Sequence, residues 1–167
     1  MIKDIVIYPD ARLREVSKEV IEFNGVNQIL DNMYDTMMEK GGVGLAGVQI
    51  GVMQRILIAN PPREDKIQYK EDLLEIINPI VLEEEGEIIF QEGCLSIPGY
   101  FEEVSRFNFI KIKFLNRFKE EKILTAEGYL AVIIQHEIDH LNGALFIDKL
   151  SFLKRKKFEK EYKSQDS

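Results

Sequence analysis

Both histidines of the 167-residue chain lie within one run of five residues, His136-Glu137-Ile138-Asp139-His140. Side chains four positions apart point the same way on an α-helix, where they lie one turn above each other. The run therefore predicts a helix that presents two imidazoles to one divalent metal ion, a spacing used by metallohydrolases. Glu137 would lie beside the ion without being a ligand, so its carboxylate can accept a proton from a bound water.

The same residues can also be ordinary surface residues of a helix, and the choice depends on a third ligand, because a catalytic zinc or iron typically has three protein ligands and a water. The longer pattern H-E-x-x-H-x-x-G-x-x-H is matched as far as Gly143, but Phe146 occupies the place of the third histidine. Glu159 is another candidate, although it lies in a strongly charged segment where exposure to solvent explains it better.

The remaining candidate for third ligand is Cys94, the only cysteine of the chain. It follows an apolar, strand-like stretch at 88–90 and precedes Pro98-Gly99, which predicts a turn. A lone cysteine is more often a small buried apolar residue than a ligand. Its place between two turn elements favours a functional role, and from charge and proximity we expect Glu92 and Arg106 to pair and hold its loop.

Three segments resemble the peptide deformylases: residues 42–49 (GVGLAGVQ), 92–96 (EGCLS) and 135–140 (QHEIDH). Their order and spacing match that family, and the likeness runs from Tyr8-Pro9 to the helix after the second histidine. The resemblance implies an enzyme that hydrolyses the N-formyl group from the formyl-methionine of newly made polypeptides and releases formate. Formyl-methionyl nascent polypeptides are therefore the expected partners.

The resemblance implies that Cys94, His136 and His140 ligate one divalent ion. Fe²⁺ is the ion that the family typically uses, and Zn²⁺, Ni²⁺ and Co²⁺ are alternatives, since an N₂S site binds Zn²⁺ more tightly than Fe²⁺. Glu137 would then act as base and acid in turn.

The family's oxyanion donors correspond here to the side-chain amide of Gln49 and the backbone N–H of Leu95, which would stabilise the developing negative oxygen. Without the resemblance, an amide bonded to local backbone would be the simpler interpretation of Gln49.

The resemblance also implies that the substrate backbone pairs, as an added strand, with the strip Val43-Gly44-Leu45, where glycine permits close approach. The methionine side chain would enter an apolar pocket lined by Tyr129, Val132 and Ile133, although helix-to-sheet packing explains these residues equally well. The family usually has alanine at the position of Gly47, so this loop is expected to be looser here. The polar stretch at residues 61–66 predicts an enlarged surface loop.

Apolar periodicity predicts helices at 26–38, between Gly128 and Gly143, and at 151–162. Runs at 55–59, 76–82, 87–90, 109–115 and 122–125 predict strands, largely antiparallel, and in one of them Ile110, Ile112 and Phe114 share an apolar face. We therefore expect an α+β fold over residues 1–167 as one domain. Mostly antiparallel sheets would pack around a central metal-binding helix, with an N-terminal and a C-terminal helix.

The formal net charge of −7 argues against broad affinity for nucleic-acid phosphates, so no DNA partner is expected. The basic cluster at 154–157 is a local exception. An exposed helix face is its simpler interpretation, and the resemblance adds contact with the ribosome. No apolar run suits a signal peptide or a membrane span, and a single cysteine favours a reducing cytoplasm, so no membrane partner is expected.

Two other functions fit parts of the pattern. A general zinc endopeptidase would use the same helix with an acidic third ligand, but the chain offers no good one. A non-catalytic metal-binding or sensing protein would close the site with Cys94 and the two histidines, which leaves Glu137 and Gln49 unexplained. The deformylase interpretation accounts for all of these residues.

Overall fold

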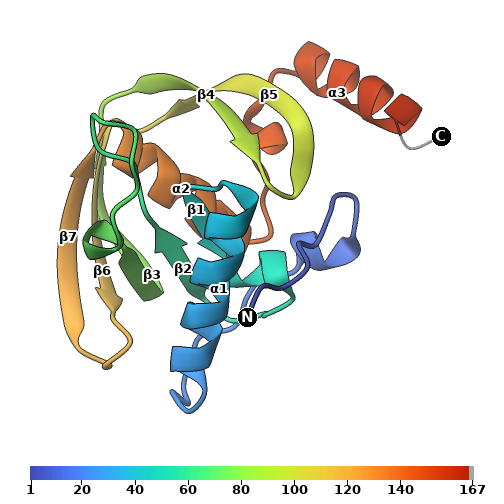
Figure 1. Cartoon of the computed structure of the whole chain (residues 1–167). Helices are drawn as coiled ribbons and strands as arrows, with labels where there is room; N and C mark the ends of the chain where they lie inside the picture. The colour runs from blue at the N-terminus through green and yellow to red at the C-terminus, as the bar shows by residue number, and fades with distance from the viewer. Residues whose placement is uncertain (166–167) are drawn as a thin grey trace.

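The computed structural model describes residues 1–165, with side chains described as far as residue 162. Its strands are β1 (Gly44–Ala46), β2 (Ile56–Ala59), β3 (Leu74–Glu85), β4 (Ile88–Cys94), β5 (Ile97–Arg106), β6 (Phe109–Leu115) and β7 (Glu121–Glu127). The helices are α1 (Val26–Lys40), α2 (Tyr129–Leu141) and α3 (Phe152–Gln165). Short 3-10 helices lie at Ala11–Arg14, Gly47–Ile50, Lys70–Asp72 and Phe146–Lys149. The predicted α+β class is confirmed (Figure 1).

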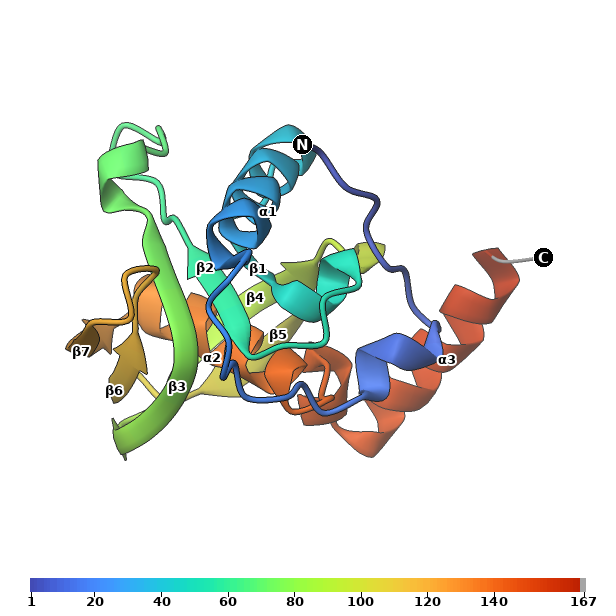
Figure 2. The same ribbon diagram turned by 90° about the horizontal axis from the view of Figure 1, so that it is seen from below.

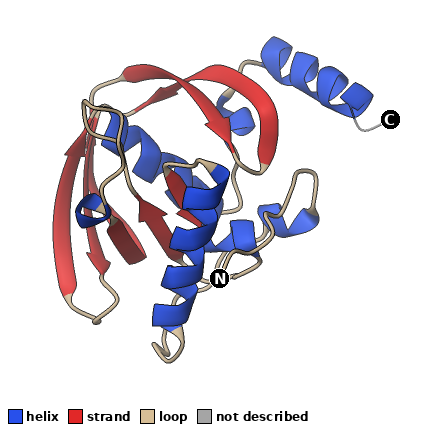
Figure 3. Ribbon diagram, viewed as in Figure 1, coloured by secondary structure: helices blue, strands red, loops and turns tan. Residues whose placement is uncertain are grey.

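The strands of the described residues form two antiparallel sheets. One has the order β1-β2-β3-β6-β7, and the other is the hairpin β4-β5. The hairpin arches over α2 in Figures 1 and 3, so the helix lies between the two sheets. The predicted arrangement of antiparallel sheets around a central helix is therefore present.

The two faces of β2 bury different helices. Ile56 and Ile58 pack in the apolar cluster of α1, whereas Leu57 and Ala59 pack in the cluster of α2. Side chains alternate between the faces of a strand, so one buried strand with four fully buried residues separates the helices. Figure 2 shows α1 and α2 on opposite sides of β1 and β2.

Helix α1 matches the predicted segment and extends two residues further, to Lys40. It ends at Gly41, whose φ of 73° is the left-handed conformation that glycine adopts without steric cost. Met33 and Met37 are fully buried, as expected for the apolar stripe of this helix.

Helix α2 is fixed along its length by the large sheet. The predicted inward residues of β6 (Ile110, Ile112 and Phe114) are buried and pack in one cluster with α2 residues such as Ile134 and Leu141. After the helix, the N–H of Gly143 donates to the carbonyl of His140 at 3.1 Å. Gly143 has a φ of 75°, and a Cβ there would lie 2.5 Å from the carbonyl oxygen of Arg14. The chain can therefore leave this helix only through a glycine.

The β4-β5 hairpin differs from its prediction. The turn lies at Leu95 and Ser96, and Pro98-Gly99 belongs to strand β5 instead of forming the turn. The pairing shifts register between Glu92 and Cys94, and Cys94 pairs with Ile97. Proline is tolerated here because an irregular hairpin leaves ladder positions without a donor requirement. Both β5 and the three-residue β1 were missed by the sequence prediction.

Helix α3 lies where the sequence places it, at the outside of the molecule (Figure 1). Phe158 is fully buried and packs against Tyr8 and Tyr100, with ring centroids 5.6 and 4.6 Å away. Phe152 and Leu153, at the start of the helix, are 72% and 78% exposed. No helix within residues 1–165 has the length and apolar character to cross a membrane.

Candidate metal centre

The three predicted ligands meet at one place although they come from distant parts of the chain. Cys94 ends strand β4, and His136 and His140 lie one turn apart on α2. One ligand atom from each lies within 4.8 Å of the others, and the Cys94 Sγ is 3.3 Å from the His140 Nε2. A thiol and two imidazoles so close together are a donor set that suits Zn²⁺ or Fe²⁺.

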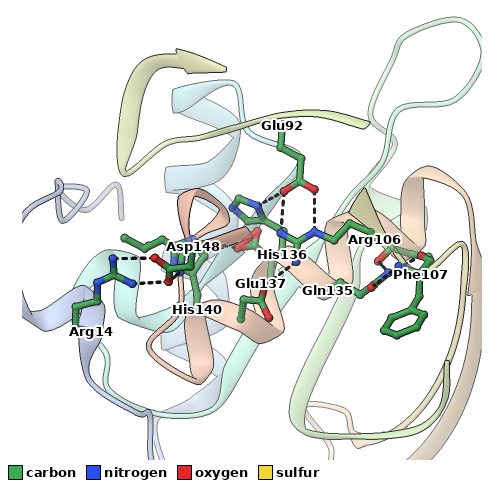
Figure 4. A network of polar contacts seen from close by, with 12 residues as sticks. Arg14, Glu92, Arg106, Phe107, Gln135, His136, Glu137, His140 and Asp148 are labelled. Atoms are coloured by element: carbon green, nitrogen blue, oxygen red, sulfur yellow. Dashed lines mark hydrogen bonds and ion pairs between the residues drawn. The ribbon is translucent and has the colours of Figure 1, made fainter. Parts of the chain in front are cut away.

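Glu92 orients the first imidazole. Its Oε1 lies 2.8 Å from the Nδ1 of His136, and Arg106 donates to both carboxylate oxygens at 2.8 and 2.9 Å (Figure 4). Burial alone would raise the pKa of Glu92, but the hydrogen bonds from Arg106 and His136 lower it to about 2. The carboxylate therefore accepts the proton of Nδ1, which leaves Nε2 of His136 free to bind an ion.

Arg106 joins the hairpin to the motif helix. Its Nη1 donates to the Oδ2 of Asp139 at 2.5 Å, while its other nitrogens hold Glu92. The predicted Glu92–Arg106 pair is confirmed and is buried, with side-chain exposures of 4% and 3%. The contacts to His136 and Asp139 were missed. Glu92 precedes Cys94 by two residues on a strand, so alternation alone places both on one face and could have revealed the first of them.

Glu137 is buried beside the ligands without a hydrogen-bond partner for its Oε1 among the described residues. This oxygen lies 4.0 Å from the Nε2 of His140. Burial raises the pKa of Glu137 to about 7 and lowers the pKa of His140 well below its ordinary value. A neutral His140 and an unpartnered buried carboxylate oxygen are what a site for a cation and a water requires, so these residues fit a divalent metal.

Gly44 packs directly against the carboxylate of Glu137. A Cβ at this position would lie 2.7 Å from the Oε2 of Glu137 and 2.8 Å from the Cγ2 of Ile133. Gly44 thus permits the close approach of the protein's own carboxylate, and the expected approach of a substrate backbone stays a prediction. Any side chain at position 44 would displace Glu137 or α2.

Gln49 turns its amide nitrogen toward the centre. Its Oε1 accepts a hydrogen bond from the backbone N–H of Ala46 at 3.0 Å, which fixes the amide orientation. Its Nε2 lies 3.2 Å from the Ser96 Oγ and 3.5 Å from the Cys94 Sγ. Leu95 lies between these two residues in the hairpin turn, and the Ser96 carbonyl accepts the N–H of Tyr8 at 2.8 Å.

A cavity of about 520 Å³ opens beside the centre. Phe90 and Tyr129 stack at its wall, with ring centroids 4.8 Å apart. The sequence-predicted residues that line it are Val43, Gly44, Gln49, Cys94, Leu95, Tyr129, Val132, Ile133, His136 and Glu137. Leu45 does not: its side chain is fully buried in the cluster of α1, so only its backbone is available at the strip. Neither is His140 in the cavity wall, being 1% exposed.

The two other positions considered for a third ligand, 159 and 146, do not contribute one. Glu159 is an exposed residue of α3 and pairs with Arg155 at 3.5 Å. Phe146 is buried, and its ring stacks on the imidazole of His136 with centroids 6.0 Å apart. Phe146 therefore packs against His136 from the sequence position at which metalloproteases with the longer H-E-x-x-H-x-x-G-x-x-H pattern have their third histidine.

The Gly47 loop and the enlarged loop are tightly attached. A Cβ at Gly47 would lie 2.9 Å from the carbonyl oxygen of Val52, so this glycine allows close packing instead of loosening the turn. Gln68, two residues after the predicted loop 61–66, donates its amide to the carbonyls of Gly42 and Asn60 at 3.0 and 2.8 Å, which holds the chain next to the strip.

Comparison with known proteins gives one consistent result. The sequence model of the family described as polypeptide deformylase matches residues 2–156. A peptide deformylase of Helicobacter pylori (strain J99) is 58% identical over 161 residues, covering 96% of this chain and 92% of that protein.

Solved structures agree. The peptide deformylase of Ehrlichia chaffeensis in complex with actinonin is 39% identical, with a TM-score of 0.88 and coverage of 98% of this chain and 97% of that one. A Met-Ala-Ser-bound peptide deformylase of Acinetobacter baumannii is 29% identical, with a TM-score of 0.83 and coverage of 90% and 99%.

Proposed function

The chain belongs to the polypeptide deformylase family, and from this premise we propose how its residues carry out the family's reaction. The chain is an amide hydrolase that removes the formyl group from formyl-methionyl polypeptides and releases formate. The observation that carries the proposed site is the close grouping of one thiol and two imidazoles beside a buried carboxylate oxygen that has no hydrogen-bond partner in the described residues.

We assign the metal ligands to Cys94, His136 and His140. A bound divalent ion would supply Lewis acidity at this position and make a water molecule acidic enough to ionise near neutral pH. Fe²⁺ is the proposed ion, with Zn²⁺, Ni²⁺ and Co²⁺ as alternatives that an N₂S donor set also accepts. Glu92 keeps His136 in the tautomer that ligation needs.

Glu137 performs the proton transfers. Its buried carboxylate has one oxygen against Gly44 and the other without a partner in the described residues, so that oxygen is available to the attacking water. Glu137 accepts a proton from this water as it attacks the formyl carbon. The same carboxyl then returns the proton to the departing amine, whose C–N bond breaks, and formate and a free amino terminus result.

Gln49 and the backbone N–H of Leu95 stabilise the negative charge that develops on the formyl oxygen. The Gln49 nitrogen is already oriented by the bond from Ala46 to its carbonyl oxygen. A donor fixed before the reaction needs no reorganisation when the charge appears, which is why such groups lower the barrier.

The substrate backbone binds as an added strand. In the described residues, β1 is an edge strand of the large sheet, and β4 pairs only with β5, so each has one free edge. Both strands line the same cavity, β1 through Gly44 and β4 through residues 90–94. An extended peptide between Val43-Gly44 and β4 would find backbone partners there.

The methionine side chain enters the inner part of the cavity toward α2. Tyr129, Val132 and Ile133 line this part, and Phe90, which the sequence did not point to, completes the wall by stacking on Tyr129. The A. baumannii relative was solved with Met-Ala-Ser, a peptide that begins with methionine. A pocket of apolar and aromatic groups suits the unbranched thioether.

Newly made polypeptides emerge from ribosomes, so we place the enzyme in the cytoplasm, with ribosome contact through α3 and no DNA or membrane partner. Two basic side chains of this helix form ion pairs within the protein: Lys154 pairs with Glu102 at 3.2 Å, and Arg155 pairs with Asp148 at 2.9 Å. Lys156 and Lys157 are also exposed; Lys156 lies over the ring of Phe152 at 4.8 Å, and Lys157 pairs with Glu161 at 3.9 Å.

Formate release tests the proposal. Protein purified without oxygen is incubated with formyl-Met-Ala-Ser, and formate is measured with and without a chelator. We expect chelator-sensitive formate, and its absence would refute the function. Cys94→Ala tests the endopeptidase alternative, which requires activity to survive, and Glu137→Ala tests the sensing alternative, which requires every function to remain intact.

A further inference from the structure

The side chain of Gln68, in the loop between β2 and β3, contacts the backbone just before the strip. Its Nε2 donates to the carbonyl of Gly42 at 3.0 Å and to the carbonyl of Asn60 at 2.8 Å. Both hydrogens of one amide group are thus used on the backbone of two neighbouring segments, one that enters β1 and one that leaves β2. The proposed function gives this contact no role so far.

Gln68 lies where the ladder between β1 and β2 ends. The N–H of Asn60 donates to the carbonyl of Val43 at 2.7 Å, and the reciprocal acceptor of such an antiparallel pair is the carbonyl of Asn60. This carbonyl accepts the Gln68 amide. The next two residues, at 61–62, are prolines without an N–H, so the backbone cannot continue the ladder beyond Asn60. Gln68 therefore donates where the strand can no longer do so.

Gly42 is held from three sides. Its N–H donates to the carbonyl of Met37 at 2.9 Å, at the end of α1. A Cβ at this position would lie 2.8 Å from the Cδ1 of Leu95, so the backbone is packed against the hairpin turn. Its carbonyl is held by Gln68, which is not among the residues that line the cavity, whereas Gly42 itself is. The Gln68 contact can therefore be removed without changing the cavity wall.

The loop that carries Gln68 is cross-linked within itself. Arg63 donates to the two carboxylate oxygens of Asp72 at 2.7 and 2.9 Å, and its guanidinium carbon lies 4.1 Å from the centroid of the Tyr69 ring. The carbonyl of Tyr69 accepts the side-chain amide of Asn60 at 2.9 Å. These contacts fix the residue next to Gln68, so the amide is held in place before any substrate binds.

The end of the strip that Gln68 holds is the end away from the reacting bond. Gly44 packs against Glu137, the proposed proton carrier, and residues 42 and 43 line the cavity before it. On the other side of Gly44, residues 45 and 46 are fully buried and do not line the cavity. A peptide paired with the strip therefore has its formyl-methionine beside Gly44 and its later residues beside 42 and 43.

We propose that Gln68 is a positioning residue, which fixes the backbone of residues 42 and 43 so that it can pair with the peptide beyond formyl-methionine. This inference rests on the proposed function. Gln68 contacts no substrate atom and acts through the carbonyl of Gly42. Its loss frees this end of the strip to move, while Glu137 and the proposed ligands stay in place.

The expected effect is on binding and depends on substrate length. A peptide that extends past methionine uses the whole strip, so the loss should raise its KM by about three- to tenfold, the net effect of one hydrogen bond. Its kcat should change by less than about twofold, because the groups that react are untouched. Formyl-methionine amide has no second residue, so its kcat/KM should change by less than about twofold.

The test compares wild type, Gln68→Met and the matched control Gln28→Met with formyl-Met-Ala-Ser and with formyl-methionine amide. Methionine keeps the length of glutamine but lacks the amide donors. Gln28 donates its amide to Asn32 at 2.8 Å on the surface of α1, so Gln28→Met should keep the wild-type kinetics. Gln68→Glu would place a carboxylate opposite two carbonyl oxygens and should raise the KM of the tripeptide further than Gln68→Met. The melting temperature and metal content of each protein are measured.

The possible results separate the positioning role from the function. Absence of formate with both substrates in wild type would refute the proposed function itself. A wild-type KM for formyl-Met-Ala-Ser in Gln68→Met and Gln68→Glu would refute only the positioning role. An equal loss for both substrates, with a lower melting temperature or a reduced metal content, would mean that the amide merely supports the fold, and this too would overturn the proposal.

Discussion

At the scale of single residues, Glu137 and Gly44 are in such close contact that each limits the substitutions accepted at the other position. The carboxylate is buried, with Oε2 near the bare Cα of Gly44 and Oε1 without a hydrogen-bond partner in the described part of the chain. A carboxylate placed in this way has its position set by packing, because few hydrogen bonds hold it. Small changes in volume or charge at either residue should therefore affect the reaction more than the fold.

Replacing Glu137 by glutamine should separate metal binding from proton transfer. The amide has nearly the same volume but accepts no proton, so kcat should fall by about 100- to 10,000-fold. Metal content should stay at the wild-type level, because Glu137 is not a ligand. Steady-state kinetics with elemental analysis check this. Full activity in Glu137→Gln would contradict the role assigned to the residue.

Gly44→Ala should reduce activity through geometry. The added methyl would lie 2.7 Å from the Glu137 Oε2, and the displaced carboxylate should lower kcat/KM by about tenfold or more. Gly42→Ala is the comparison, because its methyl would meet the end of the Leu95 side chain, which can move. A larger loss in Gly42→Ala than in Gly44→Ala would argue against the displacement of Glu137.

At the scale of elements, the β4-β5 hairpin and helix α2 are joined by the buried guanidinium of Arg106, which contacts Glu92 and Asp139. Arg106→Ala would leave the carboxylate of Glu92 buried without its cation, which should lower the free energy of unfolding by about 3–5 kcal/mol. The matched control is Arg63→Ala, which removes an exposed bidentate pair with Asp72 and should cost about 1 kcal/mol or less. Urea denaturation measures both, and equal losses would contradict the prediction.

Asp148 connects three segments, since it accepts hydrogen bonds from Arg14, Arg155 and the backbone N–H of Leu145. Burial alone would raise its pKa, but the bonds from Arg14 and Leu145 lower it below the ordinary value. The ionised Asp148 therefore adds to the free energy of unfolding above its unfolded-state pKa of about 3.9. This contribution is lost as the pH falls through the folded-state pKa of Asp148.

Asp148→Asn should therefore be less stable than wild type at pH 7 by about 1 kcal/mol, because the ion pairs are partly exposed. The difference should shrink as pH falls from about 5 toward 2. Denaturation midpoints across this pH range test it, and a difference that grows in acid would contradict the assignment.

Elements with strong periodicity were predictable from the sequence, and irregular ones were not. Helix α2 was located from the apolar periodicity between Gly128 and Gly143, and the spacing of the two histidines also predicted a helix. Strand β5 was missed because Pro98-Gly99 indicates a turn locally, whereas the turn falls at Leu95 and Ser96, where Tyr8 from a distant segment holds it. The contact of Phe101 with Gly93 depends on this register, so no local pattern could reveal it.

At the scale of the whole molecule, the two sheets bring the thiol of one to the imidazoles of the helix between them. Gln49, Cys94 and His136 lie more than 40 residues apart in the sequence, and only the complete fold brings them together. Ion binding to the folded protein should therefore raise its stability, because the unfolded chain lacks the assembled site. Chelation should lower the melting temperature and abolish formate release together.

Elemental analysis of wild type and Cys94→Ala, both prepared without oxygen, tests the shared coordination by the thiol and the two imidazoles most directly. We predict one divalent ion per chain in wild type and loss of most of it in Cys94→Ala, with circular dichroism showing that the variant keeps its helices and strands. A folded Cys94→Ala protein that still carries one ion per chain and still releases formate would contradict the account.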